Sequence, residues 1–399
     1  MKILHITDSL LKSGGGVAQV VNGLANAQTK LGHDVNVIAS RNAGKKDEVF
    51  RPEEAKVSIS GQDNLGKIWK SHSPEVRHNI KENIIGTDIV HIHGIWHYPA
   101  FLGSKLAYKG KIPYIIAPHG SLDPWCLDYR RTKKNLYMGL VQRRQLLRAS
   151  LIHAISDAET AHVKTLLPDV RIRTIHNGVS FSQVVTNEDR VFVEQIFPWL
   201  EKHRIVLFLG RLHPIKGIDI LIKAFSEAKR TQIKHALVIA GPDEVNLKNE
   251  LEELARKLGV KGKTFFTGLV EGAAKRCLLS AAEMLVSPSH SEGFSISILE
   301  AMAFSKPVVI STGCDFPEVA VEGAGIVVRP DPHELAKAMD RISCNMELAK
   351  EMGANGRRLV EEKYSWAKIA GDTIEMYNEA IDAARCANIS EPRYRPLEL

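Results

Sequence analysis

The sequence predicts an α/β protein with two doubly wound, parallel-sheet domains, and three observations lead to this prediction. The chain has 399 residues, of which 44% are hydrophobic and 25% charged, so it can bury two cores. Short apolar or β-branched runs alternate with longer helical patterns, which is the order of parallel strands and crossover helices. Such units recur in both halves of the chain, so each half is expected to form its own sheet.

The expected strands of the first half lie at residues 2–7, 34–40, 89–94, 114–118, 151–155 and 172–176. Those of the second half lie at residues 204–209, 236–240, 263–267, 283–287, 306–311 and 325–328. A helix should follow the first strand, because apolar residues recur there at helical spacing and Gly32 favours a left-handed helix end. The apolar positions are Val17, Val20, Val21, Leu24 and Leu31.

The two domains are expected at residues 1–185 and 200–365, joined within 180–203, where the apolar periodicity fades and acidic residues cluster. Apolar residues near the end of the chain predict a long helix over 364–384. The tail at 386–399 has prolines and no periodicity, so we expect it to fray. Ligands of doubly wound domains bind outside the carboxyl ends of the strands, so a ligand cleft is expected between the two domains.

Charge and cysteine content exclude several classes of protein. The net charge is +7, but the excess comes from one tract, residues 130–148, which holds seven basic residues and no acid, so a general nucleic-acid surface is disfavoured. The five cysteines are widely spaced and form no C-x-x-C pair, which indicates neither a disulfide framework nor a zinc site.

The sequence shows neither a secretory leader nor an apolar run of about 18 residues, the length that would span a membrane. We expect a cytoplasmic protein, at most peripheral to a membrane.

The loop after the first strand, TDSLLKSGGG, runs directly into a helix. Backbone N–H groups and the positive end of a helix dipole make such a place an anion site. A dinucleotide fingerprint fails here, because Gln19 replaces its third glycine and the second strand ends in Ser40 and Arg41 without an acid. A glycine-rich turn needed only for a tight connection is the alternative.

The second half opens with a similar loop in FLGRLHPIKG, which carries Arg211 and Lys216. Two cations at the carboxyl edge of a strand suit a diphosphate. A Walker A loop is unlike this one, because there a glycine precedes the lysine, whereas here Gly217 follows it. An exposed loop with two solvated cations is the alternative.

The segment SPSHSEGFSISILEAMA contains a strand end, a loop with Glu292 and a helix that we expect to begin about Ser295. Glu300 should lie on the second turn of this helix, so the two carboxylates can converge on one polyhydroxylated ligand. The N–H groups of Phe294, Ser295 and Ile296 would face a phosphate nearby. The alternative is an acid matched to the helix dipole together with one buried, partnered glutamate.

These features together resemble the retaining glycosyltransferases of family 4, which have the GT-B fold. The resemblance spans residues 1 to about 380 and departs from the usual pattern at Ser180 and Ser295. It is carried by the E-x7-E spacing from Glu292 to Glu300, the G-R-L-x-x-x-K-G loop, the Gly-Gly-Gly loop, H-N-G-V at residues 176–179 and the strand-end pair His119-Gly120.

The resemblance implies a nucleotide-sugar donor bound to the C-terminal domain. Glu300 would hold the ribose and Glu292 the hydroxyls of the sugar, while Arg211 and Lys216 would neutralise the diphosphate in place of a metal. The other implied donor-binding residues are Gly210, Gly241, Gly293, Phe294, Ser295 and Ile296.

From the first domain, the resemblance implies that His119 lies beside the anomeric carbon and that Gly15 and Gly16 close on the diphosphate. It also implies that the helix at 366–385 packs back on the first domain. No cofactor and no metal are expected.

The acceptor side gives weaker signals. His93, Trp96 and Trp125 lie in expected strand-end loops, where aromatic faces could stack on an acceptor sugar or pack under the loops. His91, His93 and His97 suggest a metal site only weakly, because no carboxylate or cysteine completes the set. Arg143 lies in the basic tract at 130–148, which is either a surface for an anionic membrane or a lipid-linked acceptor, or a solvated helix.

The sequence therefore predicts a metal-independent, retaining glycosyltransferase. It would move a hexose from a nucleotide diphosphate sugar, most plausibly a UDP-sugar, to a hydroxyl of a glycan or lipid-linked glycan in surface polysaccharide synthesis. The open alternatives are a nucleotide-sugar epimerase of similar fold, a phosphorylase with a pyridoxal phosphate lysine, and a non-catalytic sugar-nucleotide binder.

Overall fold

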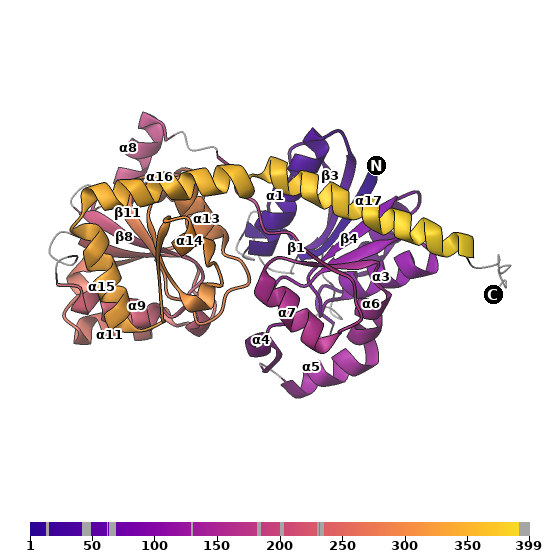
Figure 1. Cartoon of the computed structure of the whole chain (residues 1–399), viewed down its shortest axis with the longest axis horizontal. Helices are drawn as coiled ribbons and strands as arrows, with labels where there is room; N and C mark the ends of the chain where they lie inside the picture. Colours follow the sequence, from indigo (N-terminus) through magenta and orange to yellow (C-terminus); the bar gives the residue numbers. More distant parts are fainter. Residues whose placement is uncertain are drawn as a thin grey trace. The chain divides into compact units, whose positions relative to one another are not determined.

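The computed structural model divides the chain into two compact units (Figure 1). Unit 1 consists of Met1–His176 and Trp366–Leu399, and unit 2 consists of Asn177–Ser365. The structure describes all residues except 13–15, 42–48, 62, 64–68, 129–130, 182–184, 200–202, 230, 232–234 and 391–399, and the side chains of 41 and 387–390. Most of the tail expected to fray thus lies outside the described residues.

Unit 1 is built on a seven-stranded sheet in the order β3-β2-β1-β4-β5-β6-β7, with parallel pairing throughout. Its strands are β1 (Lys2–Ser9), β2 (Asp34–Arg41), β3 (Lys56–Gly61), β4 (Ile89–His93), β5 (Tyr114–Ala117), β6 (Leu151–Ala154) and β7 (Ile172–Thr174). Its helices are α1 (Gly16–Lys30), α2 (Pro74–Asn83), α3 (Tyr98–Lys109), α4 (Pro124–Asp128), α5 (Arg131–Tyr137), the π-helical turn η3 (Met138–Gln142), α6 (Arg143–Arg148), α7 (Asp157–Leu166) and α17 (Trp366–Ser390).

Unit 2 has a six-stranded sheet in the order β10-β9-β8-β11-β12-β13, also parallel. Its strands are β8 (Arg204–Leu209), β9 (His235–Ala240), β10 (Thr264–Gly268), β11 (Ala282–Ser287), β12 (Val308–Ser311) and β13 (Gly325–Val328). Its helices are α8 (Asn187–Ile196), α9 (Ile218–Glu227), α11 (Lys248–Lys257), α12 (Gly272–Ala281), α13 (Ile296–Ala303), α14 (Glu318–Val321), α15 (Pro332–Ser343) and α16 (Met346–Lys363), with 3₁₀ turns at Pro214–Lys216 (η5), Lys261–Lys263 (η6) and Thr312–Cys314 (η7).

The predicted fold class is confirmed: both halves form doubly wound parallel sheets, and every expected strand is present. Strand β3 was not predicted, because its residues are mostly only partly buried and lack a strong apolar signal. The boundary between the two compact units lies ahead of the expected linker. Unit 2 begins at Asn177, and the expected linker contains helix α8, which is capped by Thr186 and buries only Val193, so its apolar periodicity is faint.

Helix α17 belongs to unit 1 and packs along α1 (Figure 1). Close packing needs Gly23 on α1, because a Cβ there would lie 2.2 Å from the Trp366 ring. Ile369, Met376 and Tyr377 of α17 share a core cluster with residues of α1 and the sheet. The helix is longer than predicted and ends at Ser390. Among the described residues, no helix combines the length and apolar character needed to cross a membrane.

In unit 2, glycines allow the backbone segments that follow neighbouring strands to contact each other. A Cβ on Gly241, after β9, would lie 1.8 Å from the carbonyl oxygen of Gly210, after β8. A Cβ on Gly217 would lie 2.3 Å from the carbonyl oxygen of Pro288, after β11, and Gly217 also has a φ of 64°. The loops after these strands therefore meet at one edge of the sheet, where ligands of such sheets bind.

Candidate active site

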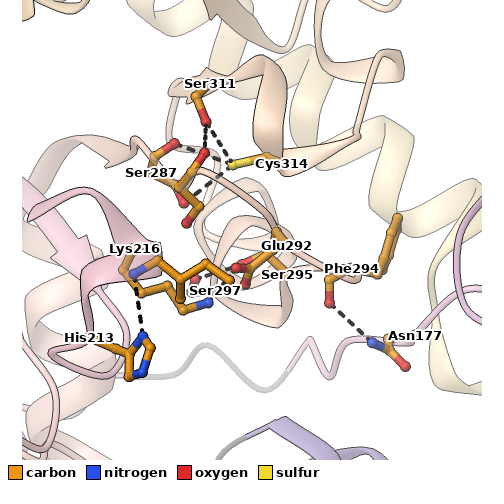
Figure 2. Close-up of polar contacts among 12 residues, drawn as sticks. Asn177, His213, Lys216, Ser287, Glu292, Phe294, Ser295, Ser297, Ser311 and Cys314 are labelled. Atoms are coloured by element: carbon orange, nitrogen blue, oxygen red, sulfur yellow. Dashed lines mark hydrogen bonds and ion pairs between the residues drawn. The ribbon is translucent and has the colours of Figure 1, made fainter. Parts of the chain in front are cut away.

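An ion pair between Lys216 and Glu292 lies at the centre of the strand-end loops of unit 2 (Figure 2). Lys216 ends the 3₁₀ turn η5 after β8, and Glu292 lies in the loop after β11. Their side chains are only 16% and 12% exposed. The two loops are also joined through the backbone, because the N–H of His290 donates to the carbonyl of Ile215 at 2.7 Å. The predicted sugar-binding carboxylate and the predicted phosphate-binding cation thus contact each other.

Arg211 lies at the start of the same loop and is more exposed, at 42% of its side chain. Its guanidinium donates to the Glu244 carboxylate at 2.6 Å. Neither predicted cation is therefore simply solvated, which was the alternative for this loop. Each is paired with a carboxylate from another loop.

Glu300 lies on α13 and accepts from Lys275 of α12 at 2.5 Å. The Glu300 side chain is 12% exposed, so this ion pair is also largely removed from water. Glu292 lies in the loop after β11 and Glu300 on the helix that follows, and each has a lysine partner. Each carboxylate is therefore matched by a cation.

Helix α13 begins at Ile296, one residue after the predicted start. Phe294 is buried against Phe316 and Tyr364, with ring centroids 4.9 Å and 5.5 Å away. Its carbonyl accepts from Asn177 Nδ2 at 3.1 Å, which holds the loop before the helix (Figure 2). The first N–H groups of any α-helix lack partners within the helix, so the start of α13 can face an anion.

A buried group of Ser287, Ser311 and Cys314 supports this loop and was missed by the sequence analysis (Figure 2). The Cys314 thiol donates to the Ser287 carbonyl at 3.3 Å, and Ser311 donates to the Ser289 carbonyl. Burial raises the pKa of the Cys314 thiol, so it stays protonated and is not a nucleophile. Gly313 permits the contact, because a Cβ there would lie 2.3 Å from the Ser289 carbonyl oxygen.

The remaining predicted donor residues of unit 2 are Gly210, Gly241 and Gly293. The first two form the close contact between the ends of β8 and β9, and the N–H of Gly210 donates to the Ala240 carbonyl at 2.9 Å. Gly293 follows Glu292 in the loop before α13 and is partly exposed.

In unit 1, His119 follows β5 and has the left-handed φ of 53°, with Gly120 next to it at 74°. This uncommon backbone turns the ring toward His93, and the two rings share a hydrogen bond of 3.0 Å. Burial lowers the pKa of His119 to about 3, so the imidazole is neutral at physiological pH. Gly16 is the exposed first residue of α1, while Gly15 lies outside the described residues.

Glu159 holds the His119 turn in place, and the sequence analysis missed it. Its carboxylate is 1% exposed and accepts from the N–H of Gly120 at 2.6 Å and of Ile155 at 2.8 Å. Burial raises its pKa to about 7. The available signal was Ser156, which caps α7 with Glu159 three positions later, as in a capping box.

The acceptor-side expectations need one correction. His93 is fully buried in unit 1, because alternation along β4 places it on a covered face of the sheet, so it is not open to an acceptor. Trp96 packs against Tyr137 with ring centroids 5.8 Å apart, whereas Trp125 on α4 is 42% exposed. Arg143 is exposed at the start of α6.

The histidines of the weakly indicated metal site, His91, His93 and His97, do not form one cluster in the structure. His97 caps helix α3 and accepts from the Ala100 N–H at 3.2 Å. The histidines whose ring nitrogens lie within 4.8 Å of one another are His5, His91 and His93. Each of these rings already has hydrogen bonds through both nitrogens.

Comparison with known proteins finds glycosyltransferase families along most of the chain. The family model described as Glycosyltransferase Family 4 matches residues 14–183, and the model described as Glycosyl transferases group 1 matches residues 190–359. An uncharacterized glycosyltransferase of Methanocaldococcus jannaschii is 28% identical, covering 92% of this chain and 95% of the relative. A GDP-mannose:cellobiosyl-diphosphopolyprenol alpha-mannosyltransferase of Xanthomonas oryzae is 22% identical, covering 96% and 98%.

Solved structures share the fold over the whole chain. Sucrose-phosphate synthase from Thermosynechococcus elongatus superposes with a TM-score of 0.76 at 19% identity, covering 96% of this chain and 100% of that one. The Anabaena protein HepE, in complex with UDP and glucose, gives a TM-score of 0.75 at 19% identity, covering 95% and 99%.

The raised pKa of Glu159 predicts a pH-dependent stability. Folding favours the protonated form, so this stabilisation is complete below the ordinary pKa of 4.5 and is lost as pH rises through about 7. The free energy of unfolding should therefore lose about 3 kcal/mol from this group between pH 4.5 and 8. Urea unfolding at a series of pH values should show this loss in wild type and not in Glu159→Gln. Asp157→Asn, exposed in the same helix turn, should keep the wild-type slope, and equal slopes in wild type and Glu159→Gln would contradict the prediction.

Proposed function

Given that this chain belongs to the family 4 glycosyltransferases and has the GT-B fold, we propose that it moves a hexose from a UDP-sugar to a hydroxyl of a glycan or lipid-linked glycan. We propose further that transfer retains the anomeric configuration and needs no metal. The observation that carries this is the set of paired charges at the strand ends of unit 2, which comprises Arg211, Lys216, Glu292 and Glu300.

The two cations are suited to a diphosphate that gains charge as it leaves. When the donor binds, Lys216 and Arg211 exchange their carboxylate partners for phosphate oxygens. Negative charge grows on the leaving diphosphate as the glycosidic bond breaks, so these cations stabilise the transition state more than the ground state. Lys216 is largely removed from water, where such an interaction is strongest.

Two carboxylates are proposed to accept from hydroxyl groups of the donor: Glu292, which Lys216 releases in this exchange, and Glu300, which is paired with Lys275. Glu292 is proposed to bind the hydroxyls of the sugar, and Glu300 those of the ribose. Both are held by short loops or helix turns at the strand ends, so their positions are set before the donor arrives.

Retention is proposed to proceed by attack on the face that the diphosphate leaves. The bond from the anomeric carbon to the phosphate oxygen breaks, the bond to the acceptor oxygen forms, and the acceptor proton passes to the departing phosphate oxygen. No carboxylate nucleophile is needed, so Glu292 has no covalent role. The neutral His119 is proposed to contact the sugar and stabilise its oxocarbenium-like state.

Two similarities bear on the substrates. HepE was crystallised with UDP and glucose, which supports a UDP-sugar donor, whereas the Xanthomonas relative is named for GDP-mannose. The same relative is named for an acceptor on diphosphopolyprenol, which supports a lipid-linked acceptor and a role in surface polysaccharide synthesis.

Two alternative functions differ from this proposal in their turnover. A nucleotide-sugar epimerase would convert its donor without an acceptor, and a sugar-nucleotide binder would show no turnover.

The basic tract is proposed to bring the enzyme to such a lipid-linked acceptor by contact with an anionic membrane. In its described part, α5, η3 and α6 expose Leu136, Leu140 and Leu147, at 65%, 72% and 48%. Arg143 and Arg144 are exposed beside them, and neither forms an ion pair with another described residue. Apolar side chains among exposed cations suit the headgroup region of a bilayer.

Nucleotide release from a panel of UDP-, GDP- and ADP-sugars, with EDTA and no acceptor, tests the donor site. We expect slow release from one donor, most plausibly a UDP-sugar, undiminished by EDTA. Lys216→Ala should lower the rate about 100-fold, because it removes a positive charge that stabilises the leaving diphosphate. Lys223→Ala, which removes a partly buried lysine of α9 paired with Asp219, is the matched control and should keep the wild-type rate. Release that requires added Mg²⁺ would contradict the metal-independent mechanism.

Sedimentation with vesicles tests the membrane contact. Wild type should bind vesicles of anionic lipid and not vesicles of neutral lipid. Reversing two charges with Arg143→Glu and Arg144→Glu should weaken binding about 100-fold. The same charge change in Lys257→Glu and Lys261→Glu, at exposed positions of unit 2, should have little effect. Equal binding by both double variants, or none by wild type, would refute the contact.

A further inference from the structure

A row of buried histidines crosses the sheet of unit 1. His5 on β1 lies opposite His91 on β4 in the parallel register, and His93 follows on the same strand. His119 stands after β5, and His153 lies on β6. The rings contact one another, with centroids 4.1 Å apart for His91 and His93 and 5.1 Å apart for His5 and His93. Their hydrogen bonds must therefore run in compatible directions.

Burial keeps these imidazoles neutral. Removal from water lowers the pKa of His5 and of His153 to about 4. The same cause, with repulsion between the neighbouring rings, holds the pKa of His91 and of His93 well below the ordinary range. A neutral imidazole has one N–H donor and one acceptor nitrogen, so each ring adopts one of two tautomers.

The carbonyl of Ile175 sets the direction of the first hydrogen bonds. A carbonyl oxygen only accepts, so His153, whose Nε2 lies 2.8 Å from it, carries its proton on Nε2. Nδ1 of His153 is then an acceptor and receives the Nε2–H of His91 at 3.2 Å. Nδ1 of His91 is an acceptor in turn, so the Tyr377 hydroxyl on α17 donates to it at 2.7 Å.

Gln28 on α1 links the hydrogen bonds of Tyr377 to those of the other histidines and fixes their donor-to-acceptor direction. Because the hydroxyl proton of Tyr377 is committed to His91, its oxygen accepts from Nε2 of Gln28 at 3.2 Å. The amide oxygen of Gln28 therefore faces His5 and accepts from its Nε2–H at 2.8 Å. The alternative orientation of the Gln28 amide would place two donors or two acceptors against each other somewhere between Tyr377 and Ile175.

The last two hydrogen bonds reach His119. Nδ1 of His5 accepts from the Nε2–H of His93 at 2.9 Å. Nδ1 of His93 then accepts from the Nε2–H of His119 at 3.0 Å. Every donor in the chain thus points away from His119 and toward the Ile175 carbonyl.

We propose that this hydrogen-bond chain fixes His119 as its Nε2–H tautomer, and that Tyr377 and Gln28 are positioning residues for it. Nδ1 of His119 is then an acceptor nitrogen, which suits a sugar hydroxyl and repels a phosphate oxygen. An amide does not relay protons, so Gln28 makes the chain an orienting device and not a path for protons. The effect on catalysis rests on the proposed function, whereas the tautomer itself does not.

Nitrogen NMR of protein labelled at histidine tests the tautomer without substrate, because protonated and unprotonated ring nitrogens give separate signals. The His119 signals are assigned by their loss in His119→Gln. Wild type should show a single Nε2–H tautomer. In Tyr377→Phe the Gln28 amide can turn over, so both tautomers of His119 should be populated within about tenfold of each other. Tyr114→Phe, which removes a buried hydroxyl that donates to the Gln145 carbonyl, is the matched control and should keep one tautomer.

An Nδ1–H tautomer in wild type, or a single Nε2–H tautomer in Tyr377→Phe, would overturn the proposal. If Tyr377→Phe does not fold, Gln28→Met interrupts the same chain, and the wild-type spectrum by itself decides the direction.

Kinetics then test the positioning role. The donor kcat/KM should fall in Tyr377→Phe by the same factor as the measured Nε2–H fraction of His119, at most about tenfold, and stay at the wild-type value in Tyr114→Phe. Mixed tautomers with an unchanged kcat/KM would overturn that role. Absence of transfer by wild type from every donor would instead defeat the proposed function, and the spectrum would still decide the tautomer.

Discussion

Contact between backbone segments at the carboxyl ends of the unit 2 strands is the constraint on which the candidate site depends. Only glycine fits at 241, where a Cβ would lie 1.8 Å from the Gly210 carbonyl oxygen. Gly217 meets the same condition beside the loop after β11. These contacts bring the loops together and so place Lys216 against Glu292. These ion pairs are partly buried, and in the proposed function a diphosphate binds there by exchanging with the carboxylates.

The polar groups buried along the sheet of unit 1 include a row of neutral histidines, in contrast to the ion pairs of unit 2. The histidines on its strands, His5, His91, His93 and His153, are buried and uncharged, so burying them requires that each donor is matched with an acceptor. Helix α17 takes part in this matching through Tyr377, although the helix lies far along the chain from β4. The helix therefore completes the polar core of unit 1 as well as its apolar core. In the proposed enzyme, unit 2 supplies charge for the leaving diphosphate, and unit 1 supplies a neutral acceptor for the sugar.

The sequence predicted those features that depend on local patterns. Strands, strand-end loops and the residues Lys216 and Glu292 follow from short motifs, because loops after parallel strands gather at one edge of a sheet. The ion-pair partner Glu244 could not be derived this way, since it acts across loops distant in the chain. The spacing from Ser156 to Glu159 gave a local signal for Glu159, but not for its hydrogen bond to the distant Gly120 N–H. The hydrogen bonds of His5 depend on strand register and on α17, neither of which a single strand discloses.

A crystal structure with a UDP-sugar analogue whose glycosidic bond cannot break would show directly whether the Lys216–Glu292 pair opens for the donor. We expect Lys216 to leave Glu292 and to bind the diphosphate together with Arg211. We expect the ribose at Glu300, with Lys275 displaced or shared. A diphosphate bound away from the strand ends of unit 2, with the Lys216–Glu292 pair intact, would contradict this expectation.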